Sequence, residues 1–197
     1  MATSTFFNIS NFRSKLTGGA RPNLFEITVT FPNLGNLAND SSFVTNSFKF
    51  LCRSAAIPAF TLGIIEVPYR GRRIKVPGDR SYADWTATVF NDDKQNMRKA
   101  FDNWMKEINN PNATEVINTI GQAYRGTVDI KHLNSEGNTS RHYKLYEAFP
   151  TDVSAIDLSY DNTDTVQEFT VTFQYHYLDV GTGGNAPTNS SVPTTSG

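Results

Sequence analysis

The last third of the chain is rich in carboxylates, and two carboxyl groups held across a sugar bond are the machinery of a glycosidase. The candidates are Asp152, Asp157, Asp161, Asp164 and Glu168. Their spacing argues against that chemistry, because Asp161 and Asp164 fall in a turn sequence where Asp and Asn favour local hydrogen bonds. Asp157 falls on the polar face of a predicted strand. We therefore predict that the protein is not an enzyme.

The sequence also gives no indication of a metal site or of a catalytic nucleophile. The histidines, His132, His142 and His176, fall in or near separate predicted strands, without a cysteine or second histidine at ligand spacing. Cys52 is the single cysteine and follows the apolar run 48–51, so we expect a buried small hydrophobe in a reducing compartment. No glycine-rich loop precedes a helix in the manner of a phosphate site. The sequence predicts no metal, no cofactor and no disulfide.

One short stretch is strongly basic. Five cations fall within eleven residues, opposed by Asp79: Arg70, Arg72, Arg73, Lys75 and Arg80. Phosphate binding is one use of such a cluster, but specific nucleic-acid binders surround it with further basic or stacking residues, and the net charge here is −1. A solvated hairpin and an assembly arm both remain open. Pro68 and Pro77 favour the arm, because they stiffen an extended segment.

Charge is distributed unevenly along the chain. No lysine or arginine follows Lys144, whereas seven acidic residues do: Glu147, Asp152, Asp157, Asp161, Asp164, Glu168 and Asp179. If the fold keeps the basic and acidic parts apart, copies attract one another head to tail, which builds rings or filaments. If the fold interleaves them, no such attraction arises.

Length and composition suit one soluble domain. The chain has 197 residues, 38% of them hydrophobic, and no apolar run approaches the roughly 18 residues of a membrane span. The first residues do not form a signal peptide. We expect a single domain over 1–180, comprising an N-terminal arm (1–22), an extended hairpin (54–83) and a helix (92–108), followed by a flexible tail (181–197).

Strand patterns dominate the chain, with one clear helix. Alternation of apolar and polar residues predicts strands over 25–31, 48–53, 64–67, 73–76, 85–90, 127–133, 143–149, 153–160 and 166–178. The helix follows Asn91-Asp92-Asp93 and has one apolar face, Met97, Phe101, Trp104, Met105 and Ile108. We predict a loop over 32–47 and a short helix within 113–124. The fold class is mainly β, an antiparallel sandwich or barrel with one flanking α-helix.

The polar faces of the clearest strands have little charge. They consist of Glu26, Thr28, Thr30, Glu168, Thr170, Thr172 and Gln174. Such a surface is neutral to weakly acidic, so we expect it to repel a polyanion weakly and to offer it no binding site. A conduit for DNA needs these properties.

Four motifs in one order resemble a known family. They are ARPNLF at 20–25, RRIKVPGDR at 72–80, DWTATV at 84–89 with ND at 91–92, and FPT at 149–151. Over about residues 20–178 the chain is similar to the tail tube (tail core) proteins of large contractile-tailed bacteriophages.

The resemblance implies a structural virion protein, made in the bacterial host cytoplasm. Members form hexameric rings in which each subunit adds strands to one inner β-barrel, and the rings stack into a tube inside the sheath. The implied partners are further copies, the sheath, a baseplate tube initiator, the tape-measure protein, a tail terminator, and double-stranded DNA passing through without sequence-specific binding. The polar strand faces above are the lumen candidates.

By the same resemblance, the basic hairpin corresponds to the inter-ring stacking arm. Its candidate residues are Ile64, Arg70, Arg72, Arg73, Lys75 and Arg80, and we hypothesise that Asp157, Asp161 and Asp164 of the next ring are its complement. The loop 32–47 and the tail after Val180 are longer than in compact members. The alternatives are the inner tube of a related injection machine, in type VI secretion or a phage-tail-like bacteriocin, and a β-sandwich carbohydrate-binding module. Phe169, Phe173, Tyr175 and Tyr177 share the phase of Val171 and are predicted core, which disfavours that module.

Overall fold

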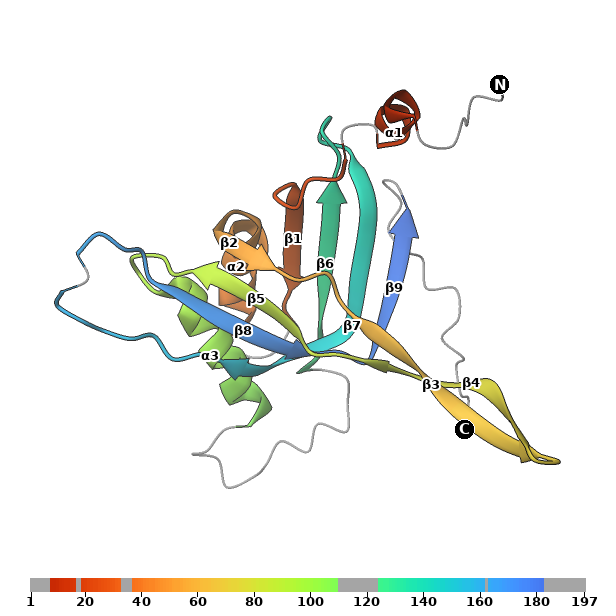
Figure 1. The fold of residues 1–197 in the computed structure, drawn as a ribbon. Coiled ribbons are helices and arrows are strands. Elements are labelled where there is room, and N and C mark those ends of the chain that lie inside the picture. The colour runs from red at the N-terminus through yellow and green to blue at the C-terminus, as the bar shows by residue number, and fades with distance from the viewer. Residues whose placement is uncertain (1–7, 17–18, 33–36, 110–123, 162, 183–197) are drawn as a thin grey trace.

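A computed structural model describes residues 8–16, 19–32, 37–109, 124–161 and 163–182. Within these ranges the chain forms three helices and nine strands (Figure 1). They are, in order, α1 (Ile9–Leu16), β1 (Phe25–Thr30), α2 (Leu37–Leu51), β2 (Cys52–Ala55), β3 (Phe60–Tyr69), β4 (Arg72–Tyr82), β5 (Trp85–Phe90), α3 (Asn96–Ile108), β6 (Gly126–Leu133), β7 (Thr139–Val153), β8 (Glu168–Gln174) and β9 (Tyr177–Thr182).

Seven strands form one antiparallel sheet in two halves that share the long strand β7. The first half-sheet has the order β1-β6-β7-β9, and the second half-sheet has the order β7-β8-β5-β2. Strands of the two halves run across one another in Figure 1. Strand β7 changes direction where Glu147 adopts a φ of 55°, and its register with β8 shifts between Pro150 and Asp152. This bend allows one strand to serve both halves.

The core lies between the inner faces of the two halves and the two long helices. Each strand contributes alternate side chains, as period-two strands must. Phe101 of α3 is central, with its ring centroid 5.4 Å from that of Phe31 and 6.0 Å from that of Phe173. Phe48 of α2 adds an edge contact at 6.1 Å. The core therefore joins both helices to the second half-sheet through aromatic contacts.

The remaining two strands form a separate hairpin that projects from the body (Figure 1). Strand β3 pairs only with β4 among the described residues, over nine matched positions from Phe60–Tyr82 to Tyr69–Arg72. At the tip, φ is 45° at Arg70 and 80° at Gly71. Positive φ at both central residues is the geometry of a two-residue type I′ turn, whose twist matches that of the flanking strands. The sequence thus builds a long, regular arm.

Most sequence-based expectations about the fold are confirmed. The mainly antiparallel β class, the hairpin, and strands near 25–31, 85–90, 127–133 and 143–149 all appear. The amphipathic helix begins at Asn96 instead of residue 92. Asp92 still serves its start, because a carboxylate oxygen accepts a hydrogen bond from the Met97 backbone amide at 2.9 Å.

Three expectations were wrong. Residues 37–51 form α2, not a loop followed by a strand, because Val44 and Phe48 lie one turn apart and are fully buried. The strand expected over 153–160 ends at Val153, where the paired register of β7 with β8 also ends. The long final strand is divided into β8 and β9, and after the break the buried side chain is Leu178, while Tyr177 stacks on Tyr146 at 4.6 Å.

The N-terminal arm contains the helix α1. The helix expected within 113–124 and the tail expected over 181–197 lie almost wholly outside the described residues.

We predict that Phe101→Ala lowers the free energy of unfolding of the subunit by about 3–5 kcal/mol, because it empties a closed aromatic cluster. Phe50→Ala is the matched control, since Phe50 is 78% exposed, and its change is expected to stay within about 0.5 kcal/mol. Urea unfolding of the unassembled subunits, followed by tryptophan fluorescence, measures both. Equal losses for the two variants would contradict this account of the core.

Candidate functional site

The outer part of the hairpin has one apolar face. Side chains of alternate residues project to the same side, and cross-strand partners share it. Ile65 pairs with Val76 and Val67 pairs with Ile74, and all four are between 42% and 54% exposed. Tyr69 continues this face to the tip, opposite Arg72. We call Ile65, Val67, Tyr69, Ile74 and Val76 the arm's apolar face.

The opposite side of the outer hairpin is charged. Glu66 pairs with Lys75, and a Glu66 carboxylate oxygen accepts a hydrogen bond from Arg73 at 2.9 Å. Ile64 pairs with Pro77 on this side. Within the described part of the chain the hairpin contains this one ion pair, so most of its positive charge is uncompensated there. Nearer the body, the Arg80 guanidinium lies over the Phe60 ring at 5.0 Å.

Exposed aliphatic surface of this kind is uncommon on a finished monomer, where single exposed side chains are normal and contiguous patches mark interfaces. A two-stranded hairpin is also marginally stable by itself. The arm's apolar face therefore makes the hairpin a candidate surface for another molecule. Residue types alone predicted the charge and the β-structure of this hairpin, and the pairing register shows which side chains share a face.

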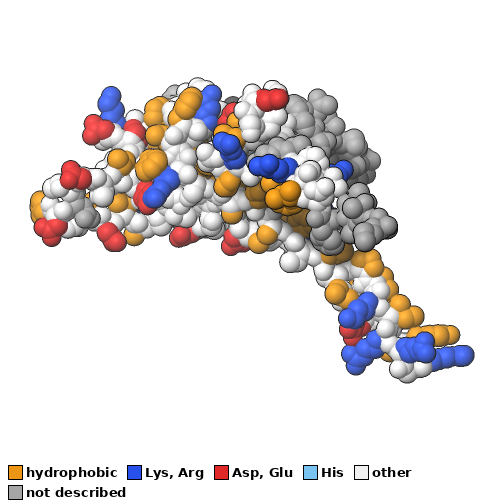
Figure 2. Space-filling view, turned by 45° about the horizontal axis from the view of Figure 1, so that its top comes forward, with side chains coloured by type: hydrophobic (Ala, Val, Ile, Leu, Met, Phe, Trp, Pro, Cys, Tyr) orange, Lys and Arg blue, Asp and Glu red, His pale blue; other side chains and the backbone are white. Residues whose placement is uncertain are grey.

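The predicted acidic partners lie in the connection between β7 and β8, whose described residues 154–161 and 163–167 we call the acidic loop. Asp157, Asp161 and Asp164 are all exposed there, and within the described residues none of the three forms an ion pair. This loop also exposes large apolar side chains, Leu158 at 81% and Val166 at 67%. Acidic side chains gather at the end of the molecule that is opposite the hairpin (Figure 2).

The lumen candidates fall on two separate surfaces. Glu168, Thr170, Thr172 and Gln174 share the outer face of β8 in the second half-sheet. The pairs Thr86–Thr172 and Thr88–Thr170 make this face a block of threonines, with Gln174 donating to Asp84 at 2.6 Å. Thr86 and Thr88 were not among the predicted residues, although their alternation with Trp85 and Ala87 was the signal for them.

Glu26, Thr28 and Thr30 lie on the outer face of the first half-sheet. This face is more charged, because Lys131 approaches Glu26 at 3.8 Å and Lys144 approaches Asp129 at 3.9 Å. Asp129 also bonds the buried His142 at 2.8 Å. The inner faces of both half-sheets enter one core, so the two outer faces point away from each other. One channel wall can use only one of them.

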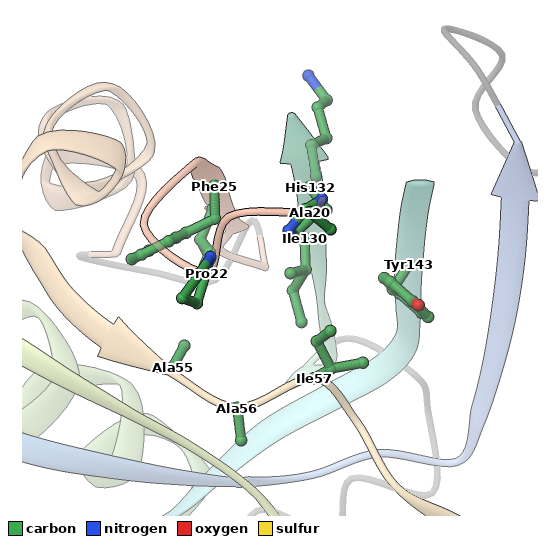
Figure 3. A pocket seen from close by; sticks show the side chains of 11 residues that line it. Ala20, Pro22, Phe25, Ala55, Ala56, Ile57, Ile130, His132 and Tyr143 are labelled. Carbon is green, nitrogen blue, oxygen red and sulfur yellow. The ribbon is translucent and has the colours of Figure 1, made fainter. Parts of the chain in front are cut away.

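An apolar pocket of about 250 Å³ lies between the inner face of the first half-sheet and the connection from β2 to β3 (Figure 3). In Figure 3, Phe25 and Ile130 come from β1 and β6, Ala55 is the last residue of β2, and Ala56 and Ile57 come from the connection. The pocket suits an apolar side chain. Lys131, His132 and Tyr143 supply its polar groups.

The described residues hold no group of three or more His, Cys, Asp and Glu side chains suited to a metal ion. Cys52 is buried, and burial raises the pKa of its thiol to about 12. In the described ranges no helix is both long enough and apolar enough to cross a membrane.

Comparison with known proteins points in one direction. A sequence model described as phage tail tube protein matches residues 20–180. Tail tube protein gp19 of Enterobacteria phage T4 is 28% identical over 161 residues, covering 81% of this chain and 91% of that protein. The tail tube protein of Serratia phage KSP90 is 23% identical over 170 residues, covering 85% and 93%.

Solved structures of similar fold come from contractile assemblies. A chain in the 6-fold symmetrised anti-feeding prophage baseplate has a TM-score of 0.58 at 14% identity, with 83% of this chain and 95% of that chain covered. A chain in the extended sheath-tube complex of the PVC extracellular contractile injection system has a TM-score of 0.58 at 13% identity, with 89% and 99% covered. At these identities the likeness shows the fold alone.

We predict that the native Cys52 thiol does not react with a maleimide at pH 8 on the timescale of minutes. Its pKa rises from 9.0 to about 12, which lowers the reactive thiolate fraction roughly a thousandfold, and burial blocks access. Mass spectrometry of the labelled chain, native and in urea, measures this. Stoichiometric labelling of the folded protein would contradict the placement of Cys52.

Proposed function

The chain belongs to the phage tail tube protein family, and on that premise we propose that its copies close into hexameric rings that stack into the inner tube of a contractile phage tail. The observation that carries the proposal is the family match over residues 20–180. The protein is a virion component of a contractile-tailed phage. We assign it no enzymatic role, because its conspicuous surfaces are a projecting arm and polar strand faces.

We propose that the second half-sheet forms the wall of the channel. Its two outer strands, β2 and the Phe149–Val153 end of β7, each pair on one side only within the described residues, so neighbouring copies can extend the sheet on both sides. The paired strands β2 and β5 also lead, through short connections, into the arm. If the arm contacts a neighbouring copy, the second half-sheet therefore lies next to the interface with that copy.

The threonine face of the second half-sheet then lines the lumen, with Thr86, Thr88, Thr170 and Thr172 at its centre. Hydroxyl groups hydrate the wall, and they offer a polyanion neither attraction nor strong repulsion. Such a wall suits double-stranded DNA in transit. The charged outer face of the first half-sheet, with Glu26, Thr28 and Thr30, lies away from the channel in this arrangement.

We propose that the hairpin is the stacking arm between rings, as its basic residues and its projection suggest. Further partners follow from the family: sheath outside the tube, a baseplate initiator at one end, a terminator at the other, and the tape-measure protein inside. The inner tube of a related contractile injection machine is the second candidate. The folds of the anti-feeding prophage and PVC chains favour it.

We predict that Thr172→Cys is shielded in assembled tubes from a large polyethylene-glycol maleimide but reacts with a small maleimide, because only the small reagent enters the lumen. Thr28→Cys is the matched control, a half-buried threonine on the other outer face. It is expected to react alike in tubes and in free subunits. Cys52 adds little background for the reason given above. The reverse pattern would move the lumen to the first half-sheet.

We predict that Arg72→Glu with Arg73→Glu abolishes stacked tubes while the subunits stay folded. The double change reverses the charge of the arm, and exposed residues outside the core rarely affect folding. Lys94→Glu with Lys99→Glu makes the same charge change at exposed positions near the start of α3 and is the control. Electron microscopy and circular dichroism give the readouts. Normal tubes from the arm variant would refute an arm-based stack.

A further inference from the structure

We propose that the arm's apolar face docks onto the acidic loop of a second copy, and that aliphatic contacts within a ring of ion pairs hold this junction. The inference rests on the proposed tube function and names the surface that receives the arm. The sequence suggested a purely electrostatic contact. The structure adds exposed apolar side chains to both of the oppositely charged elements.

The two elements are complementary in both respects. The arm exposes aliphatic side chains beside uncompensated cations, including Arg72 and Lys75. The acidic loop exposes Leu158 and Val166 beside uncompensated carboxylates. Apolar surfaces gain by leaving water together, and peripheral opposite charges set orientation and association rate more than affinity. Within the described residues, neither element finds such a partner in its own chain.

The acidic loop offers a recess for this contact. A hollow of about 370 Å³ lies between its two limbs, with one wall at Ile156–Leu158 and the other at Val166–Glu168. Aliphatic side chains of the arm can enter this hollow, while Asp157 on one wall meets an arginine; Glu168 on the other wall already pairs with Arg53 of its own chain. The proposed docking thereby gives the loop between β7 and β8 a role other than packing in the core.

The contact can form only between copies. The hairpin and the acidic loop lie at opposite ends of the molecule (Figures 1 and 2). Two different surfaces that bind each other head to tail produce a heterologous interface, which repeats from copy to copy. A repeating contact of this type is what a ring or a stack of rings requires.

Helix α1 is the competing ligand for the acidic loop. Its apolar stripe, Ile9, Phe12 and Leu16, is exposed, and Arg13 and Lys15 follow in its last turn. Two features favour the arm: it has five cations against two, and its aliphatic residues are fixed on a paired two-stranded face. The helix therefore enters the test as the alternative outcome.

Cysteine cross-linking between two singly substituted chains tests the docking. Ile74→Cys and Leu158→Cys chains are mixed, assembled into tubes and oxidised briefly, and disulfide-linked dimers are counted on a non-reducing gel. We expect the mixture to yield at least tenfold more dimer than either variant alone. Ile74→Cys mixed with Phe50→Cys is the matched control, because Phe50 is equally apolar and exposed but lies on α2.

The possible results distinguish a failure of the docking proposal from a failure of the proposed tube function. A wild-type chain that forms neither rings nor tubes counts against the proposed function. Wild-type tubes without the Ile74–Leu158 cross-link, or with a cross-link from Phe12→Cys to Leu158→Cys in its place, overturn the docking alone.

Polar truncation provides an independent check on the apolar part of the junction. Leu158→Ser is expected to raise the protein concentration needed for tube formation at least tenfold, at both low and high salt, since salt screens charges and not aliphatic contacts. Phe50→Ser, the control at an equally exposed apolar position, leaves that concentration unchanged. Tubes of Leu158→Ser that form at the wild-type concentration contradict the proposal.

Discussion

The feature on which the proposed assembly depends is the solvent-exposed aliphatic surface of β3 and β4. Ile65, Val67, Ile74 and Val76 lie on one face of a two-stranded ribbon, and no core covers this face among the residues that the structure describes. Burying such side chains contributes on the order of 1–2 kcal/mol each, which is ample to hold an arm against a partner. Under the proposed function, assembly covers this surface of the free subunit.

The other elements of the fold form the core and connect it to this arm. Both half-sheets and both long helices contribute side chains to one core, from which the arm projects. The second half-sheet connects directly to the arm, because β2 precedes β3 and β5 follows β4. The bend of β7 at Glu147 joins the two halves, and the Glu147 carboxylate pairs with Arg125. One strand thus belongs both to the core and to the proposed wall.

Local sequence patterns predicted many of these elements correctly. They failed where contacts with distant parts of the chain determine the secondary structure. Alternation around Trp85 and Val128 and the helical spacing of Met97, Phe101 and Trp104 were sufficient for those elements. The helix α2 was missed because its Ser, Thr and Asn residues disfavour helix, and burial of Val44 and Phe48 overrides that preference. The break before Tyr177 was missed because the apolar alternation of β8 continues in the sequence through Tyr175 and Tyr177, although β8 and β9 pair with different stretches of β7.

The site was predicted in part for the same reason. Charge and β-propensity located the arm, but which face is apolar depends on the pairing register of β3 with β4, including the shift between Leu62 and Ile64. The lumen candidates were chosen as polar residues on strands. Their division between two opposed faces follows from sheet topology, which no local window contains.

Hydrogen exchange on free subunits and on assembled tubes tests the central claim, that the arm is completed by another copy. Amides in 60–82 and 154–167 are expected to exchange quickly in the free subunit and to slow together, by at least tenfold, in the tube. Amides of α3, already buried in the core, should change little. An arm that exchanges equally fast in both states would contradict the account.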